Sequence, residues 1–362
     1  MGNQRRKILG VLAAAAVLAC GLLAAPWGPR LSGDVSGDAA LAEAVRPLLK
    51  NPADRISVAY IEDGDVRFAG FGADEQTEFE IGSVSKTFTA ALLADAVERG
   101  EVTLETTVAD IMGPDLADPD AEVGSLTLAE LASHRSGLPR LSTDPASLAA
   151  ALLGTYLHRD PYTASPAAVL KHAQKASVSG RGSLSYSNLG YAFLGQLLAK
   201  ATGMSYADLL RQRILEPLDL KDTYVPVTAG NLRPDAPTGR SASGLGQGAW
   251  TANGTAPAGG IRSTAADMAR YAQALLAGTA PGVKALDPQW DSDVDGEQVG
   301  LAWFTRASSE SPARSVTWHN GMTGGFASMA ALDRDAGRAV LIFSNVASSQ
   351  EEAALTLLKE GL

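Results

Sequence analysis

The chain has 362 residues, of which 46% are hydrophobic and 19% charged, a composition that allows a globular fold with a sizeable core. Asp and Glu outnumber Lys and Arg by 40 to 30, which argues against nucleic acid as the main partner. The single cysteine, Cys20, excludes an intrachain disulfide.

The first 30 residues predict export. Arg5-Arg6-Lys7 precede an apolar run over 8–27, and such a pattern directs the rest of a chain across a membrane. The run is long enough, at ~20 residues, to span a bilayer. It also contains Cys20 in a setting that resembles a lipoprotein box. We therefore expect residues 1–30 to be a signal sequence or membrane anchor. A lipid on Cys20 and an uncleaved helix are equal alternatives, with cleaved secretion as a third. Residues 31–362 would form the domain on the extracytoplasmic face of the cell membrane.

The first part of this domain combines helices with a hairpin. After a short helix over 39–50, residues 56–61 and 66–71 alternate in hydropathy around Asp63-Gly64, which is typical of a β-hairpin. From Ser83 onward the apolar residues take helical spacing, and Gly100 ends that helix.

The middle of the chain is predicted to be largely helical, and strands return late. We expect helices over 192–201, 264–276 and 351–358, a long loop over 235–260, and strands over 299–305, 315–318, 326–332 and 338–344. This order predicts an α+β fold in which N- and C-terminal strands form one antiparallel sheet, flanked by helices, with a largely helical middle domain.

Ser83 and Lys86 lie three residues apart at the start of a predicted helix. Residues at this spacing share a face, so the Lys86 amine can reach the Ser83 hydroxyl. The N-terminal end of a helix also favours negative charge on a serine oxygen. Ser85 points elsewhere. The pair predicts an activated serine, although serine and lysine also meet at this spacing by chance.

Tyr186-Ser187-Asn188 offers a second pair of polar side chains. In an extended loop, Tyr186 and Asn188 face the same side and could enter one site together. A phenol beside a lysine ammonium can have its ionised form favoured and can shuttle protons. The alternative is a tyrosine that packs in the core or caps a helix.

His319-Asn320-Gly321 follows a predicted strand and precedes Met322. A glycine there lets the strand edge approach a ligand closely, and the histidine supplies a donor. The alternative is a hairpin turn with a surface histidine. The other three histidines show no metal-ligand spacing and are interpreted as structural or surface residues.

Together and in this order, the three motifs resemble those of the serine β-lactamase and penicillin-recognising enzyme superfamily. Class C β-lactamases, D-alanyl-D-alanine carboxypeptidases and β-lactamase-fold esterases are the most similar members. The resemblance extends from about residue 56 to the C-terminus and includes three further segments: Phe79-Glu80-Ile81-Gly82, Ser133-His134-Arg135-Ser136-Gly137-Leu138-Pro139 and Ala258-Gly259-Gly260-Ile261-Arg262-Ser263.

The resemblance implies a role for each matched residue. Ser83 would be the acylated nucleophile, with Lys86 and Tyr186 as its activating couple. Asn188 would bind the substrate amide or orient Lys86, and His319, where many relatives have lysine, would donate a hydrogen bond near the substrate. The oxyanion hole would be the backbone N–H groups of Ser83 and Met322, and Asn320 and Gly321 would contact substrate. No metal or cofactor is implied. The partner would be a small-molecule, peptide or ester substrate, including cell-wall-derived ones.

Two questions stay open from the sequence. The first is whether the protein is an enzyme or a non-catalytic penicillin- or peptidoglycan-binding sensor of the same fold. The second is the substrate, because His319, Asn320 and Met322 each replace a group that helps relatives hold a substrate carboxylate. We therefore expect weak or no β-lactamase activity and better turnover of uncharged esters or of amides that lack a free carboxylate, unless Arg262 or another basic residue points into the site.

Overall fold

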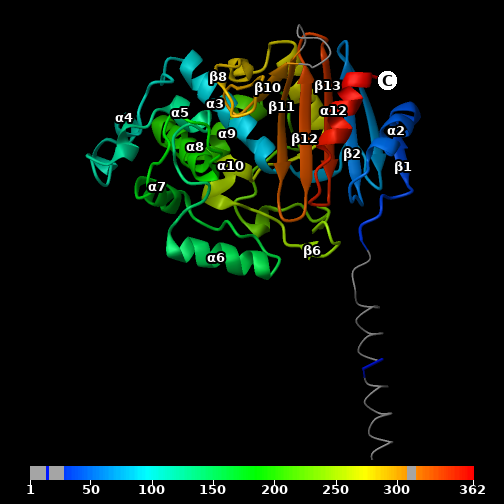
Figure 1. Cartoon of the computed structure of the whole chain (residues 1–362), viewed down its shortest axis with the longest axis horizontal. Coiled ribbons are helices and arrows are strands. Elements are labelled where there is room, and N and C mark those ends of the chain that lie inside the picture. The colour runs from blue at the N-terminus through cyan, green and yellow to red at the C-terminus, as the bar shows by residue number, and fades with distance from the viewer. Residues whose placement is uncertain (1–13, 16–27, 308–314) are drawn as a thin grey trace, which may run out of the picture.

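The computed structural model describes residues 14–15, 28–307 and 315–362 (Figure 1). Cys20 and nearly all of the predicted export segment lie outside the described residues, so both anchor alternatives stay predictions. Within the described ranges, no helix combines the length and apolar character that crossing a membrane requires.

Within the described residues, a nine-stranded antiparallel sheet forms the centre of the domain, with strand order β1-β3-β2-β13-β12-β11-β10-β9-β8. Its first three strands come from the start of the domain and the other six from its end, so the sheet closes from both ends of the chain as predicted. The strands are β1 Val35–Gly37, β2 Ile56–Glu62, β3 Asp65–Phe71, β8 Trp290–Asp291, β9 Glu297–Val299, β10 Phe304–Ala307, β11 Ser315–Met322, β12 Ala327–Asp333 and β13 Arg338–Ser344. Two small ribbons pair β4 Glu78–Glu80 with β7 Arg262–Thr264 and β5 Gly239–Arg240 with β6 Gly246–Gln247.

Helices cover both faces of the sheet and form the middle of the chain. They are α2 Ala39–Val45, α3 Ser85–Glu98, α4 Val108–Met112, α5 Leu128–Ala132, α6 Pro145–Tyr156, α7 Pro166–Gln174, α8 Asn188–Thr202, α9 Tyr206–Leu210, α10 Ala256–Gly259, α11 Ala265–Leu276 and α12 Glu351–Glu360. α2 and α12 pack on one face and enclose a small core. α11 packs on the other face, where a larger core continues through α3 and α8 into the helical part. Because successive strand residues point to opposite faces, β2 and β13 supply both cores.

Two predicted elements differ in the structure. The strand predicted over 299–305 is split, because β9 ends at Val299 and the chain turns back before β10. The Gly300 N–H donates to the Trp303 carbonyl at 2.8 Å in that turn. The loop predicted over 235–260 contains β5, β6 and α10.

Candidate active site

Ser83 lies in a short 3₁₀ turn, Gly82–Val84, between β4 and the start of α3. Gly82 has a φ of +50°, and a β-carbon there would lie 2.6 Å from the Met322 backbone nitrogen. A side chain at this position would therefore meet both backbone strain and a steric clash. Glycine allows the turn to press against β11 and to present Ser83 beside that strand.

Lys86 is the second residue of α3 and is fully buried beneath Ser83. Its Nζ donates to Ser83 Oγ at 3.0 Å, to Asn188 Oδ1 at 2.8 Å and to the Ala258 carbonyl at 2.5 Å. Burial, assisted by the positive charge of Arg140, lowers the pKa of Lys86 well below its usual value. In its neutral form the amine can still donate to Asn188 and Ala258 while its lone pair faces the Ser83 hydroxyl.

Tyr186 contacts Ser83 from the other side. Its hydroxyl and that of Ser83 are hydrogen-bonding partners, and its ring lies 4.9 Å from Lys86 Nζ. Burial raises the pKa of Tyr186 to about 12, against the lowering effects of the Ser83 hydrogen bond and of Arg140. A phenol with this pKa is protonated at neutral pH, so the environment favours a proton donor rather than the ionised form considered from the sequence.

Ser187 and His134 hold Tyr186 and Asn188 in place. The Ser187 side chain caps α8 by accepting from the Gly190 N–H at 2.8 Å, and α8 begins with Asn188. His134 is fully buried, and its ring lies 4.2 Å from that of Tyr186. Its Nδ1 accepts from the Ser187 N–H at 3.1 Å. Burial lowers the pKa of His134 well below its usual value, so it supports Tyr186 as a neutral ring.

His319 is buried inside β11 and is not a surface residue of a turn. Its Nδ1 lies 2.6 Å from the Asn320 carbonyl oxygen, which can only accept, so Nδ1 carries the proton. Burial lowers the pKa of His319 to about 3, and the ring is therefore neutral, with a bare Nε2. In this arrangement no N–H is left for substrate, which differs from the donor role that the family resemblance implies.

The backbone of β11 adjoins the nucleophile turn. A β-carbon on Gly321 would lie 2.1 Å from the Ile81 carbonyl oxygen and 3.0 Å from the Ser83 backbone nitrogen. The Thr323 N–H donates to the Phe326 carbonyl at 2.9 Å, so it points toward β12. Successive amides along a strand point in alternate directions. The Met322 amide therefore points away from β12, and Gly82 packs against the Met322 backbone nitrogen. The two amides predicted to form an oxyanion hole are thus close together.

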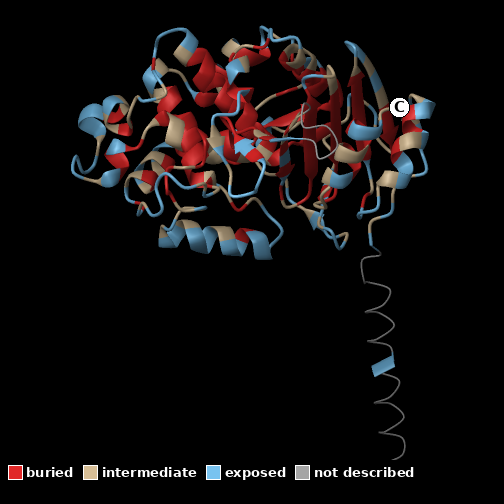
Figure 2. Cartoon of the chain, turned by 45° about the horizontal axis from the view of Figure 1, so that its top comes forward, coloured by how far each residue is buried: buried red, intermediate tan, exposed pale blue. Residues whose placement is uncertain are grey.

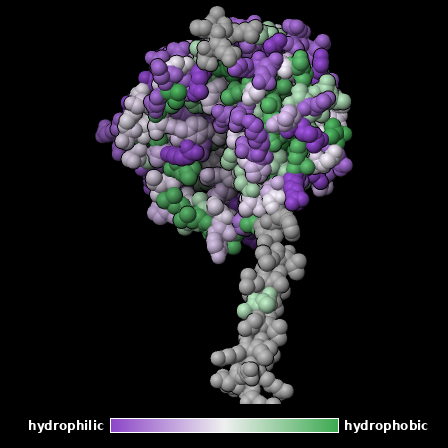
Figure 3. Space-filling model, turned by 45° about the vertical axis from the view of Figure 1, so that its right-hand side comes forward, coloured by the Kyte–Doolittle hydropathy of each residue, from purple (hydrophilic) through white to green (hydrophobic). Residues whose placement is uncertain are grey.

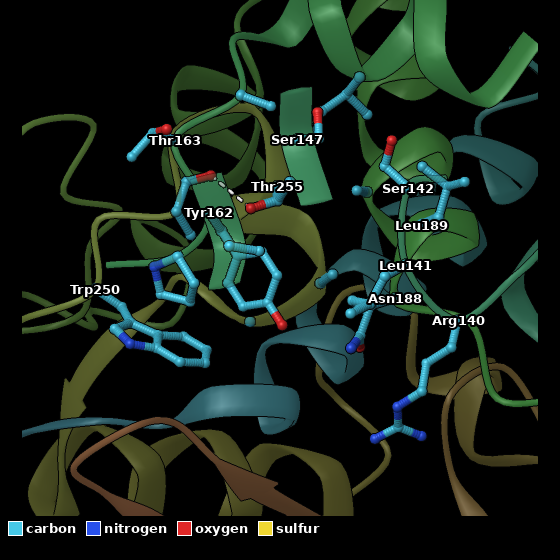
Figure 4. A pocket seen from close by; sticks show the side chains of 18 of the residues that line it. Arg140, Leu141, Ser142, Ser147, Tyr162, Thr163, Asn188, Leu189, Trp250 and Thr255 are labelled. Atoms are coloured by element: carbon cyan, nitrogen blue, oxygen red, sulfur yellow. Dashed lines mark hydrogen bonds between the residues drawn. The ribbon is translucent and has the colours of Figure 1, made fainter. Parts of the chain in front are cut away.

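A pocket of about 930 Å³ opens above Ser83. Tyr186, Asn188 and Met322 line it together with Ser83, as do the predicted contact residues Asn320 and Gly321, while Lys86 and His319 lie beneath the surface. Much of the remaining wall is apolar and includes Leu141, Leu148, Ala151, Leu189 and Ala192. Tyr162 and Trp250 meet edge to face at 5.0 Å on another side of the pocket (Figure 4).

Charged residues at the pocket are distributed unevenly. Arg262 does not line the pocket. It is buried between Glu78 and Glu80 and binds both carboxylates. Arg140 does line the pocket, 5.1 Å from the Tyr186 ring, and forms no ion pair within the described chain. At the β11 edge, Asn320 Nδ2 donates to Glu351 Oε2 at 3.1 Å, which places a carboxylate there. The sequence motif over 133–139 ends immediately before Arg140, so the sequence could have indicated Arg140 as a residue of the site.

Comparisons with known proteins show the family and the fold of the chain. The sequence model of the family described as Beta-lactamase matches residues 41–360. The chain is 32% identical to Penicillin-binding protein 4 of Amycolatopsis lactamdurans, over 45% of this chain and 42% of that protein. It is also 32% identical to a Beta-lactamase of Escherichia coli (strain K12), over 56% of this chain and 48% of that protein. The chain thus spans about half the length of these curated relatives. A solved class C beta lactamase from Rhodobacter sphaeroides shares the fold, with a TM-score of 0.72, 22% identity and coverage of 89% of this chain and 99% of that one.

Proposed function

The chain belongs to the beta-lactamase family, as its sequence motifs predict, and we propose that it is a serine hydrolase that forms an acyl-enzyme on Ser83. Its homologues are serine hydrolases. The observation that carries the proposal is the 3.0 Å hydrogen bond between Ser83 Oγ and the buried Lys86 amine at the base of an open pocket. Buried amines with a lowered pKa are suited to act as bases near neutral pH.

In the proposed mechanism, neutral Lys86 takes the proton of Ser83 as Oγ attacks the substrate carbonyl carbon. The carbonyl oxygen becomes an oxyanion, which the Ser83 and Met322 N–H groups stabilise. When the tetrahedral intermediate collapses, the bond to the leaving alcohol or amine breaks. The Tyr186 hydroxyl donates its proton to that leaving group, and the Lys86 ammonium then returns a proton to Tyr186. In deacylation, neutral Lys86 takes a proton from the attacking water and gives it to Ser83 Oγ as the bond to the acyl group breaks, which releases the acid.

For the substrate, we propose an ester or amide whose leaving group carries no carboxylate. The β11 edge, where β-lactamase relatives bind an anionic group, offers the neutral His319 and the Glu351 carboxylate, which repels anions. Arg262 is unavailable because Glu78 and Glu80 bind it, which leaves Arg140, beside the Tyr186 ring, as the arginine of the pocket lining. The half-exposed Met322 side chain and the apolar pocket wall favour an apolar substrate instead.

A non-catalytic sensor of the same fold is the second candidate, since one relative is a penicillin-binding protein. A kinetic panel tests both proposals. It pairs short-chain nitrophenyl esters with a chromogenic cephalosporin and a D-Ala-D-Ala peptide. We expect repeated turnover and the highest kcat/KM for an ester. A single stoichiometric burst without turnover on every substrate would favour the sensor. A higher kcat/KM for the cephalosporin or the peptide than for every ester would contradict the substrate proposal.

A further inference from the structure

Helix α6, Pro145–Tyr156, lies beside the active-site pocket and is exposed along most of its length (Figure 2). Gly154 is its only buried residue, and a β-carbon there would lie 2.9 Å from the Asp160 carbonyl oxygen. The glycine lets the helix approach the chain that follows it. Ala146, Ser147, Ala150 and Ala151 line the pocket from the inward side of the helix.

The outward side of α6 is apolar and uncharged. The large exposed side chains that do not line the pocket follow two neighbouring rows at four-residue spacing, one with Leu152 and Tyr156 and the other with Leu153 and Leu157 just beyond the helix. Leu152 is 73% exposed and Tyr156 81% exposed. The helix contains no Asp, Glu, Lys or Arg. A surface helix of a freely soluble domain normally carries charged residues on this side, so an apolar stripe of this kind indicates a contact surface.

The described N-terminal residues join the domain on the side where α6 lies (Figure 1), and apolar side chains occur along this lower edge of the surface (Figure 3). Residues 28–34 separate the predicted membrane segment from β1, and they can extend over at most about 25 Å when fully stretched. If residues 8–27 are held in a bilayer, the domain stays within that distance of it, and the α6 side is the one nearest the connection.

We propose that the outward face of α6 binds the interfacial region of a membrane, and that the adjacent pocket takes esters with apolar acyl chains from that membrane. The substrate part of this inference rests on the proposed hydrolase function, whereas the membrane contact does not.

The chemistry of α6 fits a lipid surface. With 12 residues it is too short to cross a bilayer, but it can lie in the interface plane with its apolar side inserted. Tyr156 near its end has the amphipathic ring that favours the headgroup region. His158 and Arg159 follow and are exposed, so the C-terminal side offers basic groups to anionic headgroups.

Fluorescent labelling of the full chain tests the contact. Two single-cysteine variants of the full chain each carry an environment-sensitive fluorophore and are mixed with vesicles of phosphatidylethanolamine and phosphatidylglycerol. Leu152→Cys places the probe on α6, and Val294→Cys places it at an exposed valine between β8 and β9, on the edge of the molecule opposite α6 in Figure 1. The unsubstituted chain gives the background from Cys20. We expect the Leu152 probe to shift to shorter wavelength and to be quenched by spin-labelled lipid, and the Val294 probe to do neither. A solvent-like Leu152 probe would overturn the proposal. So would a shift that depends on protein density and not on lipid quencher, because it would indicate a second copy of the chain.

Activity measurements separate this proposal from the proposed function. The double variant Leu152→Glu/Leu153→Glu should keep kcat/KM for a soluble short-chain ester within about twofold, because these side chains do not line the pocket. It should lose about tenfold or more on a long-chain ester embedded in vesicles, since the apolar contact is removed. Equal activity of variant and parent on the embedded ester would contradict the substrate part. Absence of ester turnover in the parent would instead contradict the proposed function and leave the fluorescence result intact.

Discussion

Asn188→Asp is the substitution that best distinguishes Lys86 from Tyr186 as the base. Asn188 Oδ1 lies 2.8 Å from Lys86 Nζ, and an aspartate of the same shape would place a negative charge there. Two opposite unit charges about 4 Å apart in an environment of effective dielectric constant about 20 attract each other by about 4 kcal/mol. This attraction favours the ammonium form and therefore raises the pKa of Lys86, which in the parent protein is lowered by burial and by Arg140. A larger fraction of the base would then be protonated and inactive at neutral pH.

The pH dependence of kcat/KM for a short-chain ester measures this effect. If neutral Lys86 is the base, Asn188→Asp should lose activity at neutral pH, by at most about a thousandfold, which is the equivalent of about 4 kcal/mol in the pKa of Lys86. Activity should return as pH rises, because the rising limb of the profile moves to higher pH. Asn188→Ala is the control: it removes one hydrogen bond without adding charge and should lose only about 10–100-fold, without a large upward move of that limb. If the rising limb of the aspartate variant does not move to higher pH relative to the parent, or if alkali does not relieve its loss of activity, Lys86 is not the base. Thermal melting of each variant checks that the fold is retained.

Three further substitutions test other parts of the account. Tyr186→Phe should lower kcat for esters by about 10²–10⁴-fold, as expected for loss of a proton donor, and an unchanged kcat would remove Tyr186 from the mechanism. Glu351→Gln should raise kcat/KM for an anionic cephalosporin relative to a neutral ester by about two- to fivefold at low salt. Glu352→Gln is the control: it removes a carboxylate that pairs with Lys50, and it should leave this ratio of kcat/KM values unchanged. Equal ratios in both variants would exclude repulsion by Glu351. Arg262→Met should reduce the free energy of unfolding, measured in urea, by about 3–5 kcal/mol because it removes the buried cation that the Glu78 and Glu80 carboxylates share. Arg211→Met, in an exposed ion pair, should cost less than about 1 kcal/mol, and equal losses would refute the assigned role of the buried cluster.

Local patterns were sufficient to predict much of the fold. The Asp63-Gly64 turn and the alternating residues on either side correspond to β2 and β3, paired from Ile56 with Phe71 to Glu62 with Asp65. The predicted antiparallel sheet from both ends of the chain is confirmed. The split between β9 and β10 was not predictable from hydropathy, because the apolar residues of the turn, Leu301 to Trp303, are buried as strand residues would be.

The candidate site was predictable where chain spacing alone sets the geometry. The i, i+3 relation brings Lys86 to Ser83 even though Ser83 lies in the turn before α3. The direction of Arg262 depends instead on β4, a distant segment whose glutamates bind it. The proton position on His319 likewise depends on burial and on a backbone carbonyl, neither of which the sequence displays.

The most direct test of the central claim is the mass of a trapped acyl-enzyme. A short-chain ester is mixed with the full chain, the reaction is quenched in acid during turnover, and the intact protein is weighed. Peptide mapping then locates the adduct. We predict one added acyl group on the peptide that contains Ser83, and no adduct in Ser83→Ala. An acyl group that persists in Ser83→Ala, or one that maps to another residue in the parent protein, would contradict the account.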